Sequence, residues 1–300
     1  MAGRSGFGRA FRWFLTCAAI GAGAVVERGM RLGAQFLEPH KHAIAPEARA
    51  RALQRVPDLR DVTLHTSDGL TLRGWFSPGT RRAAVILIHG DGGDRTQLLP
   101  QAFVLARHGY GFLAYDSRAH GESDGDRTTW GDCERRDVAA ALDFVSTSAE
   151  VDPQRIALLG FSVGGTTATL VAASDLRVRA AILSPVWTSL DDEVRSKSGR
   201  FAVLKQIPAL WALRRGGVDV DAVRPVDHVQ EIAPRPVFFI AGTRDTDTPA
   251  PVMERMFEAA GTPKRLWTVP GAGHGQYLEV APAEYEARLI AFLDEALTQR

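Results

Sequence analysis

Short apolar runs alternate with longer amphipathic stretches from residue 83 onward, and this alternation restricts the fold more than any other feature of the chain. The run AAVILIHG at 83–90 is continuously apolar, as expected of a strand that is buried on both faces. Similar strands are predicted at 110–116, 155–160, 179–185, 235–242 and 264–270, and helices at 96–108, 130–149, 163–174, 250–260 and 282–298. This order indicates an α/β fold with a mostly parallel sheet covered by helices on both faces.

A hairpin precedes the alternating region and brings the expected sheet to eight strands. The stretches DVTLHT and LTLRGWFSP alternate in polarity around the turn signal Ser67-Asp68-Gly69. We therefore place one domain at 61–300. Residues 1–60 form an N-terminal apolar segment and a connecting region, with a short helix at 46–54.

The segment 187–224 breaks the alternation and is predicted to be a small helical cap over the carboxyl edge of the sheet. Loops of this length inside a compact domain are usually functional. An extra packed helix pair, interrupted at Pro208, is the alternative. The segment's apolar residues suggest an apolar acyl or alkyl substituent on the substrate, although they could equally serve packing: Trp187, Phe201, Leu204, Trp211 and Leu213.

Three interpretations of the N-terminus stay open. Arginines at 4, 9 and 12 precede an uncharged run of 14 residues, Trp13–Val26. The run is shorter than the about 20 apolar residues of a membrane span, so contact through residues 11–26 would be an anchor or an interfacial helix. A cleaved secretory signal ending near AGA at 22–24 and a helix packed on the domain are the alternatives. The first two predict a membrane-associated or exported protein with an extracytoplasmic domain, and the third allows a cytoplasmic one.

Charge and cysteine content exclude several classes of function. The formal net charge is +1 and no basic stripe interleaves with aromatic residues, so we expect no nucleic-acid partner. Cys17 lies in the apolar N-terminal run, which makes a disulfide with Cys133 improbable. No cysteine–histidine cluster of zinc-binding spacing is present, and no metal or organic cofactor is implied.

The stretch RIALLGFSVGGTTA at 155–168 places Ser162 in a G-x-S-x-G motif where a strand turns into a helix. A tight turn of this kind lifts the serine oxygen above the sheet, and Gly160 and Gly164 relieve the crowding. The new helix directs its amide groups and positive dipole end toward the same place. We therefore predict Ser162 as a nucleophile.

A serine nucleophile needs a base and an acid that orients it. His274 follows the last strand in the glycine-rich loop PGAGHGQY and is the predicted base. Five other histidines do not follow a core strand and are less suitable: His40 and His42 in the connecting segment, His65 in the hairpin, His108 at the end of a surface helix, and His228 before a proline-flanked strand. Asp245 directly follows the strand at 235–242 and is the predicted acid. Asp247 is the second choice, better suited to capping a helix or facing solvent.

The oxyanion hole is predicted from the backbone amides of Val163 and Asp91, the latter in the loop HGDGGD after the strand at 83–90. A carboxylate at Asp91 would oppose a developing negative charge. We therefore expect its side chain to turn outward or to bind the amides of its own loop. Residues expected to contact substrate are His89, Gly90, Phe161, Trp187 and Trp211.

Together these motifs resemble the α/β-hydrolase superfamily across residues 60–298. SDGLTLRGWFSP, YDSRAHGESDG and GTRDTDTP look like a bacterial branch of serine hydrolases, with dienelactone-hydrolase-like, prolyl-oligopeptidase-like and lysophospholipase-like members. The resemblance implies structural roles for Asp116 and Arg118. It implies hydrolysis of a small-molecule acyl ester or thioester through an acyl-enzyme. Peptide or amide cleavage, acyl transfer to an alcohol or amine, and a non-catalytic membrane-tethered binding protein are the alternatives.

Overall fold

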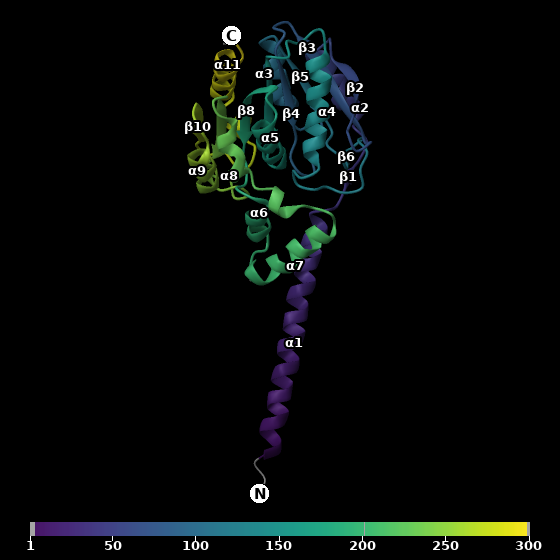
Figure 1. Cartoon of the computed structure of the whole chain (residues 1–300), viewed down its shortest axis with the longest axis vertical. Coiled ribbons are helices and arrows are strands. Elements are labelled where there is room, and N and C mark those ends of the chain that lie inside the picture. Colours follow the sequence, from purple (N-terminus) through teal and green to yellow (C-terminus); the bar gives the residue numbers. More distant parts are fainter. Residues whose placement is uncertain (1–3, 201, 299–300) are drawn as a thin grey trace.

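An eight-stranded sheet forms the centre of the computed structural model, which describes residues 4–200 and 202–298 (Figure 1). Its order is β10-β9-β8-β7-β4-β5-β3-β2. The β2–β3 and β3–β5 pairs are antiparallel and the other neighbours are parallel, which confirms the predicted sheet. The strands are β2 (Arg60–His65), β3 (Thr71–Gly79), β4 (Ala84–Ile88), β5 (Tyr110–Tyr115), β7 (Ile156–Phe161), β8 (Val178–Ser184), β9 (Val237–Gly242) and β10 (Lys264–Val269).

Helices cover both faces of the sheet because alternate residues of each buried strand point to opposite sides. In β4, Val85 and Leu87 face one apolar core, and Ile86 and Ile88 face the other. The first core is closed by α2 (Pro46–Arg55), α3 (Leu99–Arg107) and α11 (Pro282–Thr298). The second is closed by α4 (Glu134–Thr147), α5 (Val163–Ser174) and α9 (Ala250–Ala259).

The predicted insertion contains α6 (Leu190–Lys197) and α7 (Ala202–Arg215), with the short helices η1 (Val220–Ala222), α8 (Pro225–His228) and η2 (Val229–Ile232) after them. Pro208 lies inside α7 and does not interrupt it, contrary to the prediction. One short helix and two short strands complete the described elements: α10 (Tyr277–Val280), β1 (His40–Lys41) and β6 (His120–Gly121), the two strands paired in parallel.

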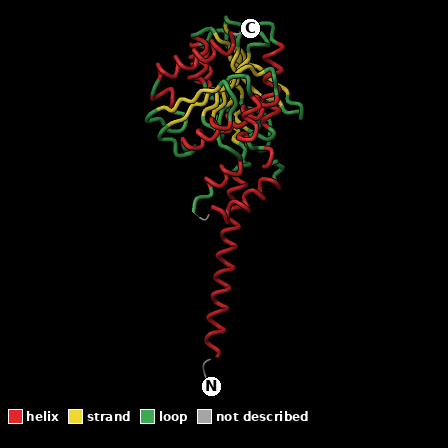
Figure 2. Tube along the Cα trace, turned by 60° about the vertical axis from the view of Figure 1, so that its left-hand side comes forward, coloured by secondary structure: helices red, strands yellow, loops and turns green. Residues whose placement is uncertain are grey.

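A long N-terminal helix, α1 (Arg4–Gln35), runs from the cap away from the domain (Figures 1 and 2). Its C-terminal part packs on α7 through Gly29 and Gly33. A Cβ at Gly29 would meet the Lys205 carbonyl and the Pro208 ring, and one at Gly33 would meet Ala209. The absence of side chains thus lets the two helix backbones approach closely.

The apolar part of α1 is exposed instead of packed on the domain. Trp13 and Phe14 are 71% and 68% exposed. The packed-helix interpretation therefore holds for the segment around Gly29 and Gly33 but not for Trp13–Val26. Among the described residues, none of the helices combines the length and hydropathy that a membrane crossing requires.

Candidate active site

Ser162 occupies a crowded turn between β7 and α5. Its φ and ψ are 55° and −120°, a backbone conformation that costs energy for any residue with a Cβ. Glycines on either side make the turn sterically accessible. A Cβ at Gly160 would lie 2.6 Å from the Cα of Gly165, and one at Gly164 would lie 2.5 Å from the His89 carbonyl oxygen. The G-x-S-x-G spacing therefore reflects two separate backbone contacts.

The start of α5 presents amide groups beside Ser162. The Ser162 carbonyl accepts hydrogen bonds from Gly165 and Thr166, at 2.8 and 3.1 Å, and so begins the helix. Val163 is the first residue of α5, where helix amides have no partner within the helix. This amide and the positive end of the helix dipole can stabilise negative charge near the serine.

Asp245 and His274 come from loops after β9 and β10 and meet at the carboxyl edge of the sheet. Asp245 Oδ2 lies 2.9 Å from His274 Nδ1. Its other oxygen accepts the amides of Asp247 and Thr248 at 2.9 and 2.8 Å, and its side chain is fully buried. A carboxylate held in this way favours a proton on Nδ1 and leaves Nε2 as the basic nitrogen.

Phe161 connects the histidine loop to the serine turn. Its ring centroid lies 4.9 Å from that of His274, and the residue directly precedes Ser162. Gly90 approaches from the other side, because a Cβ there would lie 3.1 Å from the Cβ of Ser162. The structure therefore brings Ser162, His274 and the loop after β4 to one place.

The predicted oxyanion donors line one small cavity. Asp91 and Val163 both contribute to its wall, together with Gly90 and Gly164. The loop after β4 and the start of α5 thus line one cavity, although Ser162 and His274 are not part of its wall. The catalytic roles of these residues stay predictions.

His89 also lines this cavity, but both of its ring nitrogens are engaged in hydrogen bonds within the protein. Its Nδ1 donates to the Gly90 carbonyl at 2.7 Å, and its Nε2 accepts the Ser117 amide at 2.9 Å. Burial lowers the pKa of His89 to about 3, so the ring is neutral. With both nitrogens engaged, it positions the loop.

The Asp91 side chain is exposed, in agreement with the first of the two expectations, and the charged groups nearest to it are histidines. Its Oδ1 lies 3.2 Å from Nε2 of His40 and 3.9 Å from Nε2 of His120. The sequence places His40 in the connecting segment, and β1 brings it beside His120 by pairing with β6.

Asp116 and Arg118 have structural roles, as expected. Asp116 is paired with Arg95 at 2.7 Å, and its side chain is fully buried. Arg118 pairs with Asp137 at 2.7 Å and with Asp68 at 2.9 Å. These ion pairs fix the loop after β5 and leave no charge free for catalysis.

The cap contributes one residue that the sequence did not single out. Glu193 on α6 is buried, and burial raises its pKa to about 8, with Asp91 and Asp247 adding to the effect. A carboxyl group that is neutral at pH 7 therefore lies within electrostatic reach of the site. It is one of three consecutive acids, Asp191 to Glu193, and its burial depends on how the cap is seated.

The predicted substrate contacts from the cap have mixed outcomes. Trp187 is partly buried, whereas Trp211 is 51% exposed and lies under the Arg215 guanidinium, 5.2 Å from the ring centroid. Leu213 is buried in packing and Leu204 is exposed. Phe201 lies outside the described residues. The outward position of Trp211 argues against a role in the site.

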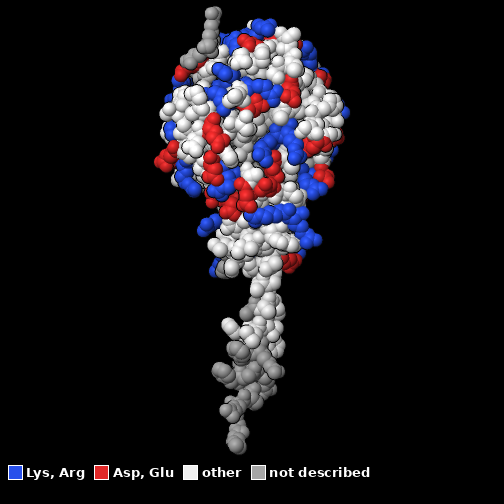
Figure 3. All heavy atoms as spheres, in the orientation of Figure 1, with Lys and Arg blue, Asp and Glu red and all other residues white. Residues whose placement is uncertain are grey.

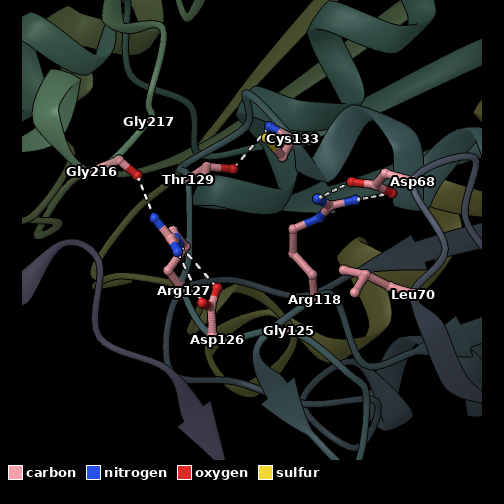
Figure 4. Close-up of a pocket in the computed structure, with 10 residues that line it drawn as sticks. All are labelled: Asp68, Leu70, Arg118, Gly125, Asp126, Arg127, Thr129, Cys133, Gly216 and Gly217. Atoms are coloured by element: carbon pink, nitrogen blue, oxygen red, sulfur yellow. Dashed lines mark hydrogen bonds and ion pairs between the residues drawn. The ribbon is translucent and has the colours of Figure 1, made fainter.

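A larger pocket lies apart from these residues (Figure 4). Arg118, Arg127 and Gly216 line it, and Ser162, Asp245 and His274 are not part of its wall. Its arginines are already paired, Arg118 with Asp68 and Arg127 with Asp126, both at 2.9 Å. The pocket therefore offers no uncompensated charge to a ligand.

Known proteins match the chain over most of the domain. The family model described as serine aminopeptidase S33 matches residues 79–216, and one described as TAP-like protein matches 209–297. An uncharacterized protein of Mycobacterium tuberculosis (strain H37Rv) is 33% identical over 223 residues, 73% of each chain. A polyketide transferase of Aspergillus fumigatus is 35% identical over 157 residues, 49% of this chain and 51% of that protein.

A solved esterase structure has the same architecture. The Pyrococcus furiosus esterase Pf2001 aligns with a TM-score of 0.73 and 25% identity, covering 87% of this chain and 98% of that one. The fold and the site define an α/β-hydrolase. The chain belongs to the α/β-hydrolase superfamily, and its relatives support hydrolysis, of esters in particular.

Proposed function

We propose that the protein is a serine hydrolase that cleaves carboxylic esters or thioesters through an acyl-enzyme intermediate. The observation that carries the proposal is the left-handed backbone of Ser162 at the β7–α5 turn, where the preceding residue, Phe161, contacts the His274 of the Asp245–His274 pair. A strained turn persists where the surrounding structure holds it, and such turns cluster at active sites. Esterase neighbours support ester chemistry.

In this mechanism the Ser162 oxygen attacks the acyl carbon while Nε2 of His274 takes the hydroxyl proton. The amides of Asp91 and Val163 stabilise the oxyanion. Collapse breaks the acyl–oxygen or acyl–sulfur bond, and His274 returns the proton to the leaving alcohol or thiol. Water, deprotonated by His274, then attacks the acyl-enzyme, and the acid and Ser162 are released.

Two other reactions use the same residues. The matching family model carries the description serine aminopeptidase, which favours amide cleavage as the second candidate. The polyketide transferase relative favours transfer of the acyl group to an acceptor other than water. Nothing in the geometry of Ser162 and His274 separates these reactions, because all pass through an acyl-enzyme.

Labelling with a fluorophosphonate tests the nucleophile. Folded wild-type protein should label, and Ser162→Ala should not; an unlabelled wild type would refute the proposal. Nitrophenyl esters of increasing acyl length, assayed beside aminoacyl amides, would separate an esterase from a peptidase. Adding alcohol and amine acceptors would reveal transfer as a new acylated product.

We also propose that α1 and α7 hold the enzyme on a membrane surface. Val203, Leu204, Ile207 and Trp211 share one face of α7 and are 51–68% exposed. Exposed apolar residues of this density usually mark a binding surface. The apolar part of α1 continues the same region, and Figure 3 shows basic side chains above it, where the cap meets the domain.

The chemistry of this surface fits an anionic bilayer. Amphipathic helices with apolar and basic residues lie in the interface between headgroups and acyl chains. The exposed run Trp13–Val26 supports an interfacial position or an anchor. A membrane location agrees with an apolar acyl substrate, and cleavage of a signal near residue 24 would remove the N-terminal part of α1 while leaving Gly29 and Gly33.

A further inference from the structure

We propose that His40, Asp91 and His120 form a binding site for a divalent transition-metal ion of the zinc class. Their ligand atoms, Nε2, a carboxylate oxygen and Nε2, lie within 4.8 Å of one another. Two imidazoles and a carboxylate are ligands that zinc takes in proteins, with water completing a tetrahedron. Tetrahedral ligands about 2.0–2.1 Å from the metal would be about 3.3 Å apart, so a small inward movement suffices.

Backbone pairing places the two histidines. In the parallel β1–β6 pair, His40 lies directly opposite His120. The His40 amide donates to the Ala119 carbonyl at 2.7 Å, and the ring centroids lie 5.2 Å apart. Side chains opposite each other in a sheet point to the same face, so both imidazoles reach toward Asp91.

One ring nitrogen of His120 is buried without a hydrogen-bond partner. Its Nδ1 hydrogen-bonds the Arg118 carbonyl at 2.9 Å and must be the donor, because a carbonyl oxygen only accepts. A neutral ring then carries its lone pair on Nε2. That nitrogen is buried, has no hydrogen-bond partner, and lies 3.9 Å from Asp91 Oδ1.

His120 Nε2 is buried, whereas the Asp91 carboxylate is exposed and also lies 3.2 Å from His40 Nε2, so one cation could interact with all three groups. A metal ion needs the neutral imidazole and the carboxylate as they are. The bond from Nδ1 to a backbone carbonyl is also the support that metal-bound histidines usually have.

The site would join three segments that are distant in the sequence. It would fix the chain after α1, through His40, to the loop that carries Asp91. If the proposed function holds, the ion would also neutralise the Asp91 carboxylate, whose backbone amide is a proposed oxyanion donor. This consequence rests on the proposed function, whereas metal binding itself does not.

Zinc binding to the full-length protein tests the site. After chelator treatment and dialysis, the protein should bind one Zn²⁺ in isothermal titration calorimetry, and Tm should rise with zinc concentration. His40→Gln should weaken binding at least about 10-fold and abolish the rise in Tm. Because His40 is partly exposed, this variant should fold; Asp91→Asn is the second variant, for the carboxylate.

His228→Gln is the matched control, because His228 is an exposed histidine 3.3 Å from the carboxylate of Glu231 with no third ligand described. It should bind zinc as the wild type does. Absence of binding to the wild type, or binding that survives in both His40→Gln and Asp91→Asn, would overturn the proposal.

Fluorophosphonate labelling of the same samples separates the two proposals. Zinc bound at these residues without labelling would leave the metal site standing and refute the hydrolase. Labelling without zinc binding would refute the metal site and leave the hydrolase proposal standing.

Discussion

Asp245 holds His274 by one carboxylate oxygen, 2.9 Å from Nδ1, while its other oxygen is held by two backbone amides. Backbone hydrogen bonds therefore hold the Asp245 carboxylate in place independently of its bond to the imidazole. Its neighbour Asp247 has an exposed side chain and no comparable position. This difference decides between the two acids that the sequence offered for one role.

Asp245→Asn should lower kcat by about 10³- to 10⁴-fold, because an amide stabilises the wrong imidazole tautomer and cannot stabilise the imidazolium. Steady-state hydrolysis of a nitrophenyl ester would measure it. Asp247→Asn makes the same change two residues away and should leave kcat within about twofold of wild type. Equal losses in both variants would show that the acid is misassigned.

Gly164→Ala should destabilise the protein by about 1–3 kcal/mol and reduce Ser162 labelling, because the new methyl group would collide with the carbonyls of Ile88 and His89. Urea unfolding gives the free energy. Gly21→Ala is the control, since a Cβ there has nothing within 4 Å. A Gly164→Ala protein as stable and reactive as wild type would contradict the close contact.

Glu193→Gln should change how stability depends on pH. The folded-state pKa of Glu193 is raised to about 8 by burial, so its contribution is full below pH 4.5 and is lost as pH rises through 8. The variant should therefore gain stability relative to wild type between pH 5 and 9, by about 1 kcal/mol or more, since each pKa unit corresponds to about 1.4 kcal/mol.

Urea unfolding of wild type and Glu193→Gln at pH 5 and at pH 9 would measure this gain in stability. Glu254→Gln, the same change on an exposed residue of α9, should show little pH-dependent difference. A difference for Glu193 that shrinks as pH rises would mean that its carboxyl group is ionised in the folded protein.

Ile207→Glu should weaken binding to vesicles that contain phosphatidylglycerol, because it places a charge on the exposed apolar face of α7. Co-sedimentation would report the bound fraction. Leu176→Glu is the control, since Leu176 is 76% exposed but lies in the α5–β8 loop. Equal binding by both variants and wild type would exclude α7 from the membrane surface.

The sheet and the positions of Ser162, Asp245 and His274 could be predicted from sequence for one physical reason. Parallel strands deliver the residues that follow them to a common edge, so order along the chain becomes proximity in space. Both faces of strands such as β4 are buried, so these strands appear in the sequence as continuous apolar runs.

The relation of His40 to Asp91 and His120 could not be predicted in this way. It depends on β1, a strand of two residues, which is too short to show a periodic pattern. The burial of Glu193 could not be predicted either, because it depends on how the cap packs on the domain and not on the pattern of its own helix. Pro208 was expected to interrupt α7, but tertiary packing on α1 outweighs the local preference.

The glycine contacts of α1 with α7 have a mechanical meaning. Because backbone lies against backbone at Gly29 and Gly33, the inserted helix cannot be displaced without carrying the N-terminal helix along. We expect α1 and α7 to move together, although α7 lies beside the domain and the N-terminal part of α1 points away from it. A tilt of the outer part of α1 would therefore be transmitted first to α7.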